Sequence, residues 1–199
     1  MQAYNYRMCF SEVPENRVPF VRPVGYDAGR YRLFARLIEA RMKAENRVPE
    51  LNSVIKVDRI PNGKADVNNN GAFSTDFIGG SWDYPDAGYA RRAAVWQEHQ
   101  DYQQGFFYFL ANDPQVPVGL RRELNHWGLC RDEFTDTGNW PHQLYIRESR
   151  RMIGEYVMVQ KDLQTELTKP DPVGMGSYNS DSHNVERIAG PDGLAMANR

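Results

Sequence analysis

The chain has 199 residues and carries 24 lysines and arginines against 26 aspartates and glutamates, which gives a formal net charge of −2. This balance argues against a nucleic-acid-binding surface, because such surfaces normally show a basic excess. Apolar residues make up 41% of the chain, which argues against global disorder. The sequence contains no run of about 18 apolar residues, so no membrane-spanning helix is predicted. The mean hydropathy of −0.68 is low for a domain of this size. Either the apolar residues are well concentrated, or part of the polar surface is buried against something outside this sequence.

The first quarter of the chain predicts a strand followed by a helix. Residues 3–10 alternate loosely between apolar and polar side chains, which favours a strand. Asp27 is a typical helix N-cap, and the residues after it repeat apolar side chains at helical spacing. We therefore expect a helix over residues 28–46.

Between residues 49 and 80 the sequence predicts antiparallel strands joined by tight turns. The segment Val54–Val57 favours a short strand, and residues 72–78 are expected to be extended. Asn62–Gly63 and Asn70–Gly71 are typical of turn positions that need a positive φ.

Two further helices are predicted, over residues 86–111 and 118–127. His99 lies on the apolar stripe of the longer helix, where we expect a satisfied, partly buried histidine rather than a metal ligand. Pro117 is expected in the first turn of the shorter helix. The predicted fold is α+β, with an antiparallel or mixed sheet and about three helices, in a single segment over residues 1–199.

The sequence predicts neither a metal site nor a secretion signal. Its cysteines and histidines lack metal-ligand spacing. We expect Cys9 and Cys130 to be reduced, partly buried thiols, with a disulfide between them as the alternative. The N-terminus lacks a charged region followed by an apolar stretch, so no signal peptide is predicted and the cytoplasm is the default location.

The first candidate functional motif is an arginine-rich segment between two predicted strand pieces, residues 144–146 and 156–159. It contains Arg147, Arg150 and Arg151. Guanidinium groups offer a planar fork of donors that matches carboxylate or phosphate groups, which predicts an anion-binding site. The alternative is a solvated strand face in which Glu148 pairs with the arginines.

The second candidate motif lies in residues 174–185 and combines Tyr178, Asp181 and His183. On a strand, Asp181 and His183 would project to the same face, and the carboxylate would orient the imidazole for proton transfer. The alternative is a polar loop with an Asx-turn at Asn179 or Asp181.

The motifs YIRESRRMIGEYVM and GSYNSDSHNVER, together with the opening QAYNYRMCF, resemble a mainly bacterial family of FAD-dependent oxidoreductases, some of whose members are labelled xanthan lyase. The resemblance runs from about Gln2 to Gly190. It implies that the glycine-rich FAD-binding unit lies upstream and a second FAD-contacting segment downstream. The chain is therefore expected to be the substrate or cap segment of a larger flavoprotein, inactive alone and without bound FAD.

The resemblance also implies roles for the two motifs within residues 144–185. In the intact enzyme they would face the flavin and a small organic or carbohydrate-like substrate, with which the flavin exchanges a hydride. His183, oriented by Asp181, would be the proton donor or acceptor, and Tyr178 a hydrogen-bonding wall. The residues expected to face substrate or cofactor are Arg147, Glu148, Arg150, Arg151 and Asn179.

Two other functions compete with this interpretation. One is a non-catalytic carbohydrate-binding module that uses Trp82, Tyr84 and Trp140, although aromatic residues at such turns usually serve packing. The other is an interaction domain that docks onto a separate flavoprotein chain.

Overall fold

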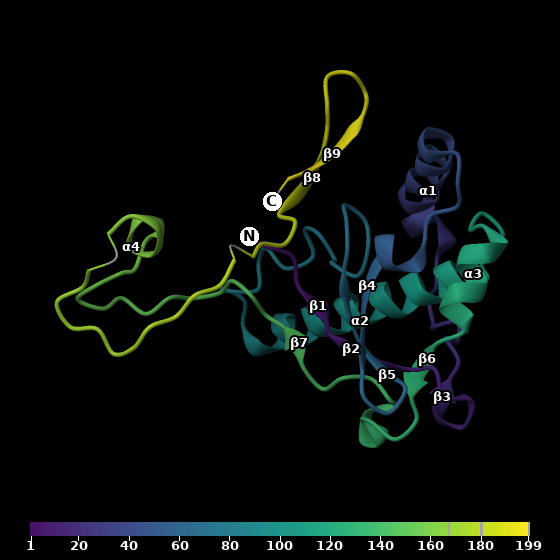
Figure 1. The fold of residues 1–199 in the computed structure, drawn as a ribbon, viewed down its shortest axis with the longest axis horizontal. Coiled ribbons are helices and arrows are strands. Elements are labelled where there is room, and N and C mark those ends of the chain that lie inside the picture. The colour runs from purple at the N-terminus through teal and green to yellow at the C-terminus, as the bar shows by residue number, and fades with distance from the viewer. Residues whose placement is uncertain (167, 180, 199) are drawn as a thin grey trace.

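The central sheet of the computed structural model has five antiparallel strands in the order β3–β6–β2–β5–β4 (Figure 1). The structure describes residues 1–166, 168–179 and 181–198. Two smaller antiparallel ribbons pair β1 with β7 and β8 with β9. The strands are β1 (Asn5–Tyr6), β2 (Met8–Ser11), β3 (Arg17–Val18), β4 (Ile55–Ile60), β5 (Lys64–Asn69), β6 (Gly128–Cys130), β7 (Leu144–Tyr145), β8 (Glu186–Ala189) and β9 (Ala195–Asn198).

All three predicted helices are present, and the α+β fold class is confirmed. The described residues also form a short fourth helix that was not predicted. Among them, no helix is long and apolar enough to cross a bilayer. The α-helices are α1 (Arg32–Glu45), α2 (Tyr89–Asn112), α3 (Val118–Asn125) and α4 (Gln160–Gln164), with short 3₁₀ turns at Pro14–Asn16, Ala28–Tyr31, Leu51–Ser53 and Thr135–Thr137.

The helix ends follow from local chemistry. The Asp27 carboxylate accepts a hydrogen bond from the Gly29 amide at 2.8 Å and starts the 3₁₀ turn that leads into α1. The same helix ends at Asn46, which has a φ of 51°. Pro117 is the N-cap of α3 rather than a residue of its first turn, so this detail of the prediction was wrong.

The β4–β5 hairpin confirms one predicted turn, whereas the extended segment expected next is wrong. Asn62 and Gly63 have φ values of 67° and 65°, as a two-residue hairpin turn requires. Residues 72–78 form bends and turns instead of a strand. Side chains replace a partner strand there, because Ser74 Oγ accepts from the Asn70 amide and Asn69 Oδ1 accepts from the Asp76 amide.

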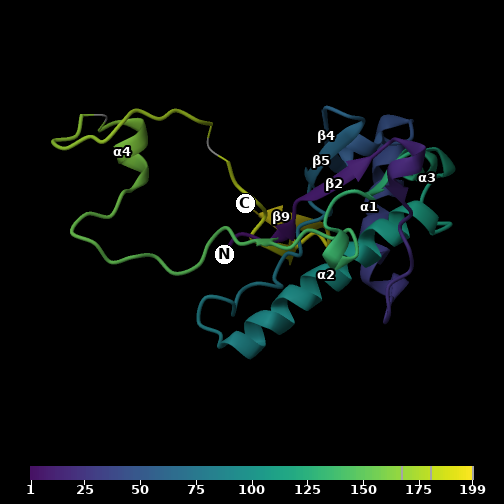
Figure 2. The same ribbon diagram turned by 90° about the horizontal axis from the view of Figure 1, so that it is seen from below.

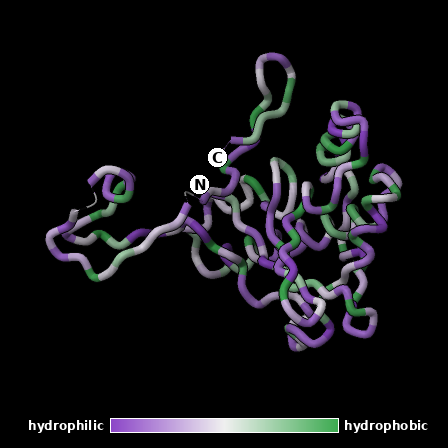
Figure 3. The backbone as a smooth tube through the Cα atoms, in the orientation of Figure 1, coloured by the Kyte–Doolittle hydropathy of each residue, from purple (hydrophilic) through white to green (hydrophobic). Residues whose placement is uncertain are grey.

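Between β7 and β8, the described residues 149–166, 168–179 and 181–182 lie on an arm that projects away from the body and carries α4 (Figures 1 and 2). The strand predicted over residues 156–159 is wrong, because this stretch lies on the arm with its side chains exposed and has no strand partner among the described residues. Figure 3 shows that hydrophobic and hydrophilic residues alternate irregularly along the arm.

The core is centred on the C-terminal half of α2. Phe106, Phe107 and Phe109 are almost fully buried and contact aromatic rings from β2 and α1. His99, about two turns before Phe106 on the same helix, is also buried, and its Nδ1 lies 2.7 Å from the Val95 carbonyl oxygen. Burial lowers the pKa of His99 to about 4. The histidine is buried, but the prediction that it is satisfied is only half right, because its buried Nε2 has no hydrogen-bond partner among the described residues.

Gly105 lets α2 approach the 3₁₀ turn before α1 closely. A Cβ at this position would lie 2.2 Å from the Tyr31 hydroxyl oxygen and 3.1 Å from Cζ of the same ring. Tyr31 has little room to move, because it is buried and donates a hydrogen bond to the Tyr102 carbonyl at 2.8 Å.

We therefore expect Gly105→Ala to lower the free energy of unfolding by roughly 1–3 kcal/mol, as overpacking does, despite the higher helix propensity of alanine. Gly119→Ala in α3 is the matched control, because its Cβ would meet Val48 Cγ1 only at 4.0 Å. That variant should gain up to about 1 kcal/mol. Urea unfolding followed by circular dichroism measures both, and equal stabilisation by the two alanines would contradict the packing argument.

Candidate functional site

A polar recess of about 240 Å³ lies where the N-terminal strand segment meets the two ends of the arm. We call it the polar recess. It brings together three of the residues singled out in the sequence with side chains from β5, β7 and the N-terminal segment. The residues that line it are Gln2, Arg7, Asn68, Tyr145, Arg147, Asp181 and His183.

His183, which lines the polar recess, forms a carboxylate–imidazole pair with Asp76, a buried residue outside the lining. Nδ1 of His183 lies 2.8 Å and 3.1 Å from the two carboxylate oxygens of Asp76. The Asp76 side chain is 1% exposed and the His183 side chain 12% exposed. Nε2 of His183 makes no hydrogen bond to the described residues.

The N-terminal strand segment positions both members of this pair. The Ala3 amide donates to the Asn184 carbonyl at 2.9 Å, and the Phe77 amide donates to the Tyr4 carbonyl at 3.2 Å. His183 and Asp76 are the neighbours of Asn184 and Phe77, so the two bonds bring them to the same place. The His183 amide also donates to Gln2 Oε1 at 2.7 Å, which fixes the backbone next to the imidazole.

Arg147 lies at the edge of the polar recess and is held from three sides. Its guanidinium donates to the Ala3 carbonyl at 2.9 Å and to Asn5 Oδ1 at 3.0 Å, and it lies 4.9 Å from the centre of the Tyr145 ring. Burial lowers the pKa of Arg147 from its ordinary value. It forms no salt bridge with the described residues, unlike Arg7, which pairs with Asp66.

The structure does not bring the other predicted arginines to the same place. Arg150 and Arg151 lie on the exposed arm, so the expected cluster of three guanidiniums is not formed. Glu148 pairs with neither of them. It accepts a hydrogen bond from the Gln2 amide at 2.7 Å, and this bond lowers the pKa of its carboxyl group.

The predicted strand geometry of the second motif is also wrong. Residues 177–179 and 181–184 form no strand. Asp181 lines the polar recess, but the carboxylate that bonds His183 belongs to Asp76, which is distant in sequence. Tyr178 and Asn179 are exposed on the arm.

Asp76 was missed because its neighbourhood was interpreted as a strand. The sequence signal was a single acidic residue within the otherwise uncharged stretch Ala72–Gly80. A carboxylate placed in such a segment is buried only where a partner compensates it, which makes it a candidate for a functional pair.

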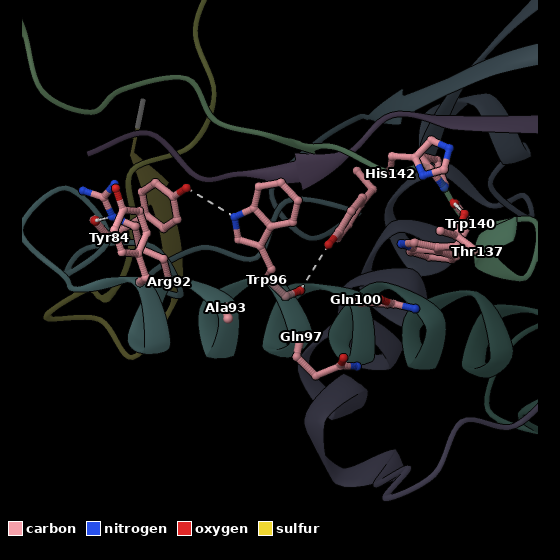
Figure 4. A pocket seen from close by; sticks show the side chains of 12 residues that line it. Tyr84, Arg92, Ala93, Trp96, Gln97, Gln100, Thr137, Trp140 and His142 are labelled. Atoms are coloured by element: carbon pink, nitrogen blue, oxygen red, sulfur yellow. Dashed lines mark hydrogen bonds between the residues drawn. The ribbon is translucent and has the colours of Figure 1, made fainter. Parts of the chain in front are cut away.

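A second, larger cavity of about 560 Å³ is an open cleft beside α2, which we call the aromatic cleft (Figure 4). Trp96 lies in its floor, donates through Nε1 to the Tyr84 hydroxyl at 3.3 Å and accepts at its carbonyl from the Tyr6 hydroxyl at 3.3 Å. Trp140 lines the far end, and its buried Nε1 has no hydrogen-bond partner among the described residues. Of the three predicted sugar-binding aromatics, Tyr84 and Trp140 line this cleft and Trp82 does not.

The family model described as FAD dependent oxidoreductase matches residues 1–198. The match covers nearly the whole chain, so the chain belongs to this family of flavoprotein oxidoreductases, and the family resemblance seen in the sequence is confirmed. No curated protein and no solved structure matches the chain. The xanthan lyase label and the interpretation as an interior segment stay predictions.

The described residues fit only part of what an FAD site requires. Dinucleotides are usually held by a parallel strand–helix–strand unit whose helix N-terminus faces the pyrophosphate. Every strand pair in the described part of the chain is antiparallel, so that unit is not among these residues. The donors and the cation of the polar recess instead suit a substrate or the reacting ring of a flavin. No cluster of three or more His, Cys, Asp or Glu side chains suited to a metal occurs within the described ranges.

Because Asp76 accepts a hydrogen bond from Nδ1, we expect neutral His183 to carry its proton on Nδ1. Asp76→Ala should abolish this preference, whereas Asp181→Ala should keep it. Long-range ¹H–¹⁵N spectra of histidine-labelled protein report the tautomer, and the chain has only four histidines to assign. A tautomer change in Asp181→Ala, with none in Asp76→Ala, would show that Asp181 rather than Asp76 orients His183, as the sequence predicts.

Proposed function

We propose that this chain forms the substrate side of the reaction site in an FAD-dependent oxidoreductase, with His183 as the group that takes or gives a proton. The observation that carries the proposal is the bond between Nδ1 of His183, which lines the polar recess, and the buried Asp76 carboxylate. FAD, when bound, would supply the hydride chemistry of the family.

The Asp76–His183 pair has the arrangement of a general base. A carboxylate bonded to Nδ1 fixes the tautomer and stabilises the imidazolium that forms when Nε2 accepts a proton. A substrate hydroxyl beside Nε2 would lose its proton to His183 as the adjacent C–H bond is oxidised. In the reverse direction, His183 would return the proton to a carbonyl oxygen. The substrate we propose is therefore a small hydroxyl-bearing or carbohydrate-like molecule.

Arg147 supports the binding of an anionic group in the same recess. Its guanidinium donates to neutral acceptors, the Ala3 carbonyl and the Asn5 amide oxygen, and forms no salt bridge with the described residues, although the Asp76 and Asp181 carboxylates favour its charged form from a distance. A partly buried cation of this kind interacts strongly with a carboxylate or phosphate. Arg147 and His183 are the predicted residues on which this proposal rests, whereas Asp181 only lines the recess.

Chemical rescue tests the role of His183. In the protein carrying its FAD, we expect His183→Ala to slow flavin reduction by roughly 10²–10⁴-fold, the usual contribution of general acid–base catalysis. The probe is a panel of monosaccharides and sugar acids, followed anaerobically by loss of flavin absorbance. Added imidazole should restore part of the rate, because it can occupy the space that the side chain leaves.

The matched control is His126→Ala, which removes an exposed histidine that pairs with Glu12 on the surface. This variant should reduce its flavin at the wild-type rate, with or without imidazole. A folded His183→Ala protein that keeps the wild-type rate, or one that imidazole does not rescue, would contradict proton transfer by His183.

The aromatic cleft supports a second candidate function, carbohydrate binding without catalysis. Its floor and walls combine Trp96 and Tyr84 with the polar side chains of Gln97 and Gln100. Aromatic rings with amide groups beside them match the apolar faces and hydroxyls of a pyranose ring.

Calorimetric titration with cellotetraose and with tetragalacturonate tests the aromatic cleft. We expect Trp96→Ala to weaken binding by about tenfold or more, because it removes the stacking surface. Trp82→Ala is the matched control, since Trp82 is exposed but lies outside the cleft. No heat of binding with either oligosaccharide, or loss of binding in Trp82→Ala alone, would rule out this function for the cleft.

A further inference from the structure

The two cysteines of the chain face each other across neighbouring strands of the central sheet. β2 and β6 are antiparallel, with Phe10 opposite Leu129, so the same register places Cys9 opposite Cys130. Their Sγ atoms are 3.0 Å apart, and both thiols are free. Residues directly opposite on antiparallel strands have a Cα separation within the range that a disulfide spans. A bond between these sulfur atoms therefore needs little backbone movement.

The surroundings of the two thiols differ. Cys130 is buried, with 1% of its surface exposed, whereas Cys9 is half-buried. The hydrogen bond from the Cys130 thiol lowers the pKa of Cys9, and the nearby Lys64 ammonium lowers it further. The same interaction raises the pKa of Cys130. The more accessible sulfur is thus also the one more easily converted to a thiolate, which is the nucleophilic form.

We propose that Cys9 and Cys130 form a reversible disulfide site that exchanges with low-molecular-weight disulfides such as oxidised glutathione. The Cys9 thiolate attacks one sulfur of the small disulfide, which releases one thiolate and leaves a mixed disulfide on Cys9. The Cys130 thiol then loses its proton and attacks the Cys9 sulfur, which releases the second small thiolate. Two protein thiols are oxidised and one small disulfide is reduced to two thiols.

The cross-link would stiffen the part of the sheet that carries the polar recess. Cys9 follows Arg7 by two residues, and Arg7 lines the recess. β2 also pairs with β5, in which Val67 lies opposite Met8. Joining β2 to β6 covalently would limit the separation of the strands around Arg7, and it would close a long loop of the chain, which stabilises the folded state.

Intact-mass spectrometry of the full chain in glutathione redox buffers tests the proposal. With excess oxidised glutathione, we expect the loss of two hydrogen atoms, a rise in Tm of about 10 °C and full reversal by reduced glutathione. Failure of the monomer to lose two hydrogens, or a stable glutathione adduct on the wild-type protein, would overturn it.

Single serine variants test the assigned order of attack. Cys130→Ser keeps the attacking thiol and should accumulate a glutathione adduct on Cys9. Cys9→Ser keeps only the buried thiol and should stay unmodified in the folded state, which circular dichroism verifies. An adduct that forms faster on Cys130 than on Cys9 would show that the order is wrong.

Discussion

The structure depends on one constraint, which is that the backbone of residues 3–6 runs through the interior and must be hydrogen-bonded there. Buried peptide groups without partners are costly, so the surrounding segments are arranged to supply donors and acceptors. The side-chain amide of Gln103, itself fully buried on α2, bonds both the amide and the carbonyl of Tyr6 at 2.9 Å. Arg147 bonds the Ala3 carbonyl. A polar glutamine in the middle of an aromatic helix is explained by this requirement.

The hydrogen bonding of the buried residues 3–6 also forms the candidate site. For this reason the pairing of Asp76 with His183 could not be predicted from the sequence. His183 and Asp76 meet because their neighbours bond adjacent residues of the buried strand, and no local pattern encodes a contact between segments so far apart. Local spacing instead favoured Asp181 as the partner of His183. His183, Asp181 and Arg147 were among the candidate residues of the two separate motifs, and these three line the polar recess.

Elements that depend on a few neighbouring residues were predictable from the sequence. Elements that depend on contacts with distant parts of the chain were not. The Asp27 cap and the Asn62–Gly63 turn depend on a few neighbouring residues, and both are found in the structure. Residues 156–159 have strand-like composition but no strand to pair with among the described residues. Apolar residues of the arm, such as Ile153 and Val173, are exposed, so the body reaches its dense aromatic core with only part of the apolar content of the chain.

In this site, the chain segment that connects two site residues is not the segment that holds them in place. Arg147 and His183 lie at the two ends of the arm, and both are held by bonds to the N-terminal strand segment rather than by contacts within the arm. The arm therefore acts on the site chiefly through the entropy of closing a loop, which changes by only about 0.6 kcal/mol when the loop length is halved or doubled. Apart from Asp181, which lines the polar recess, its sequence and length are consequently free to change without moving the imidazole or the guanidinium, which makes the arm the part of this fold best able to acquire new contacts.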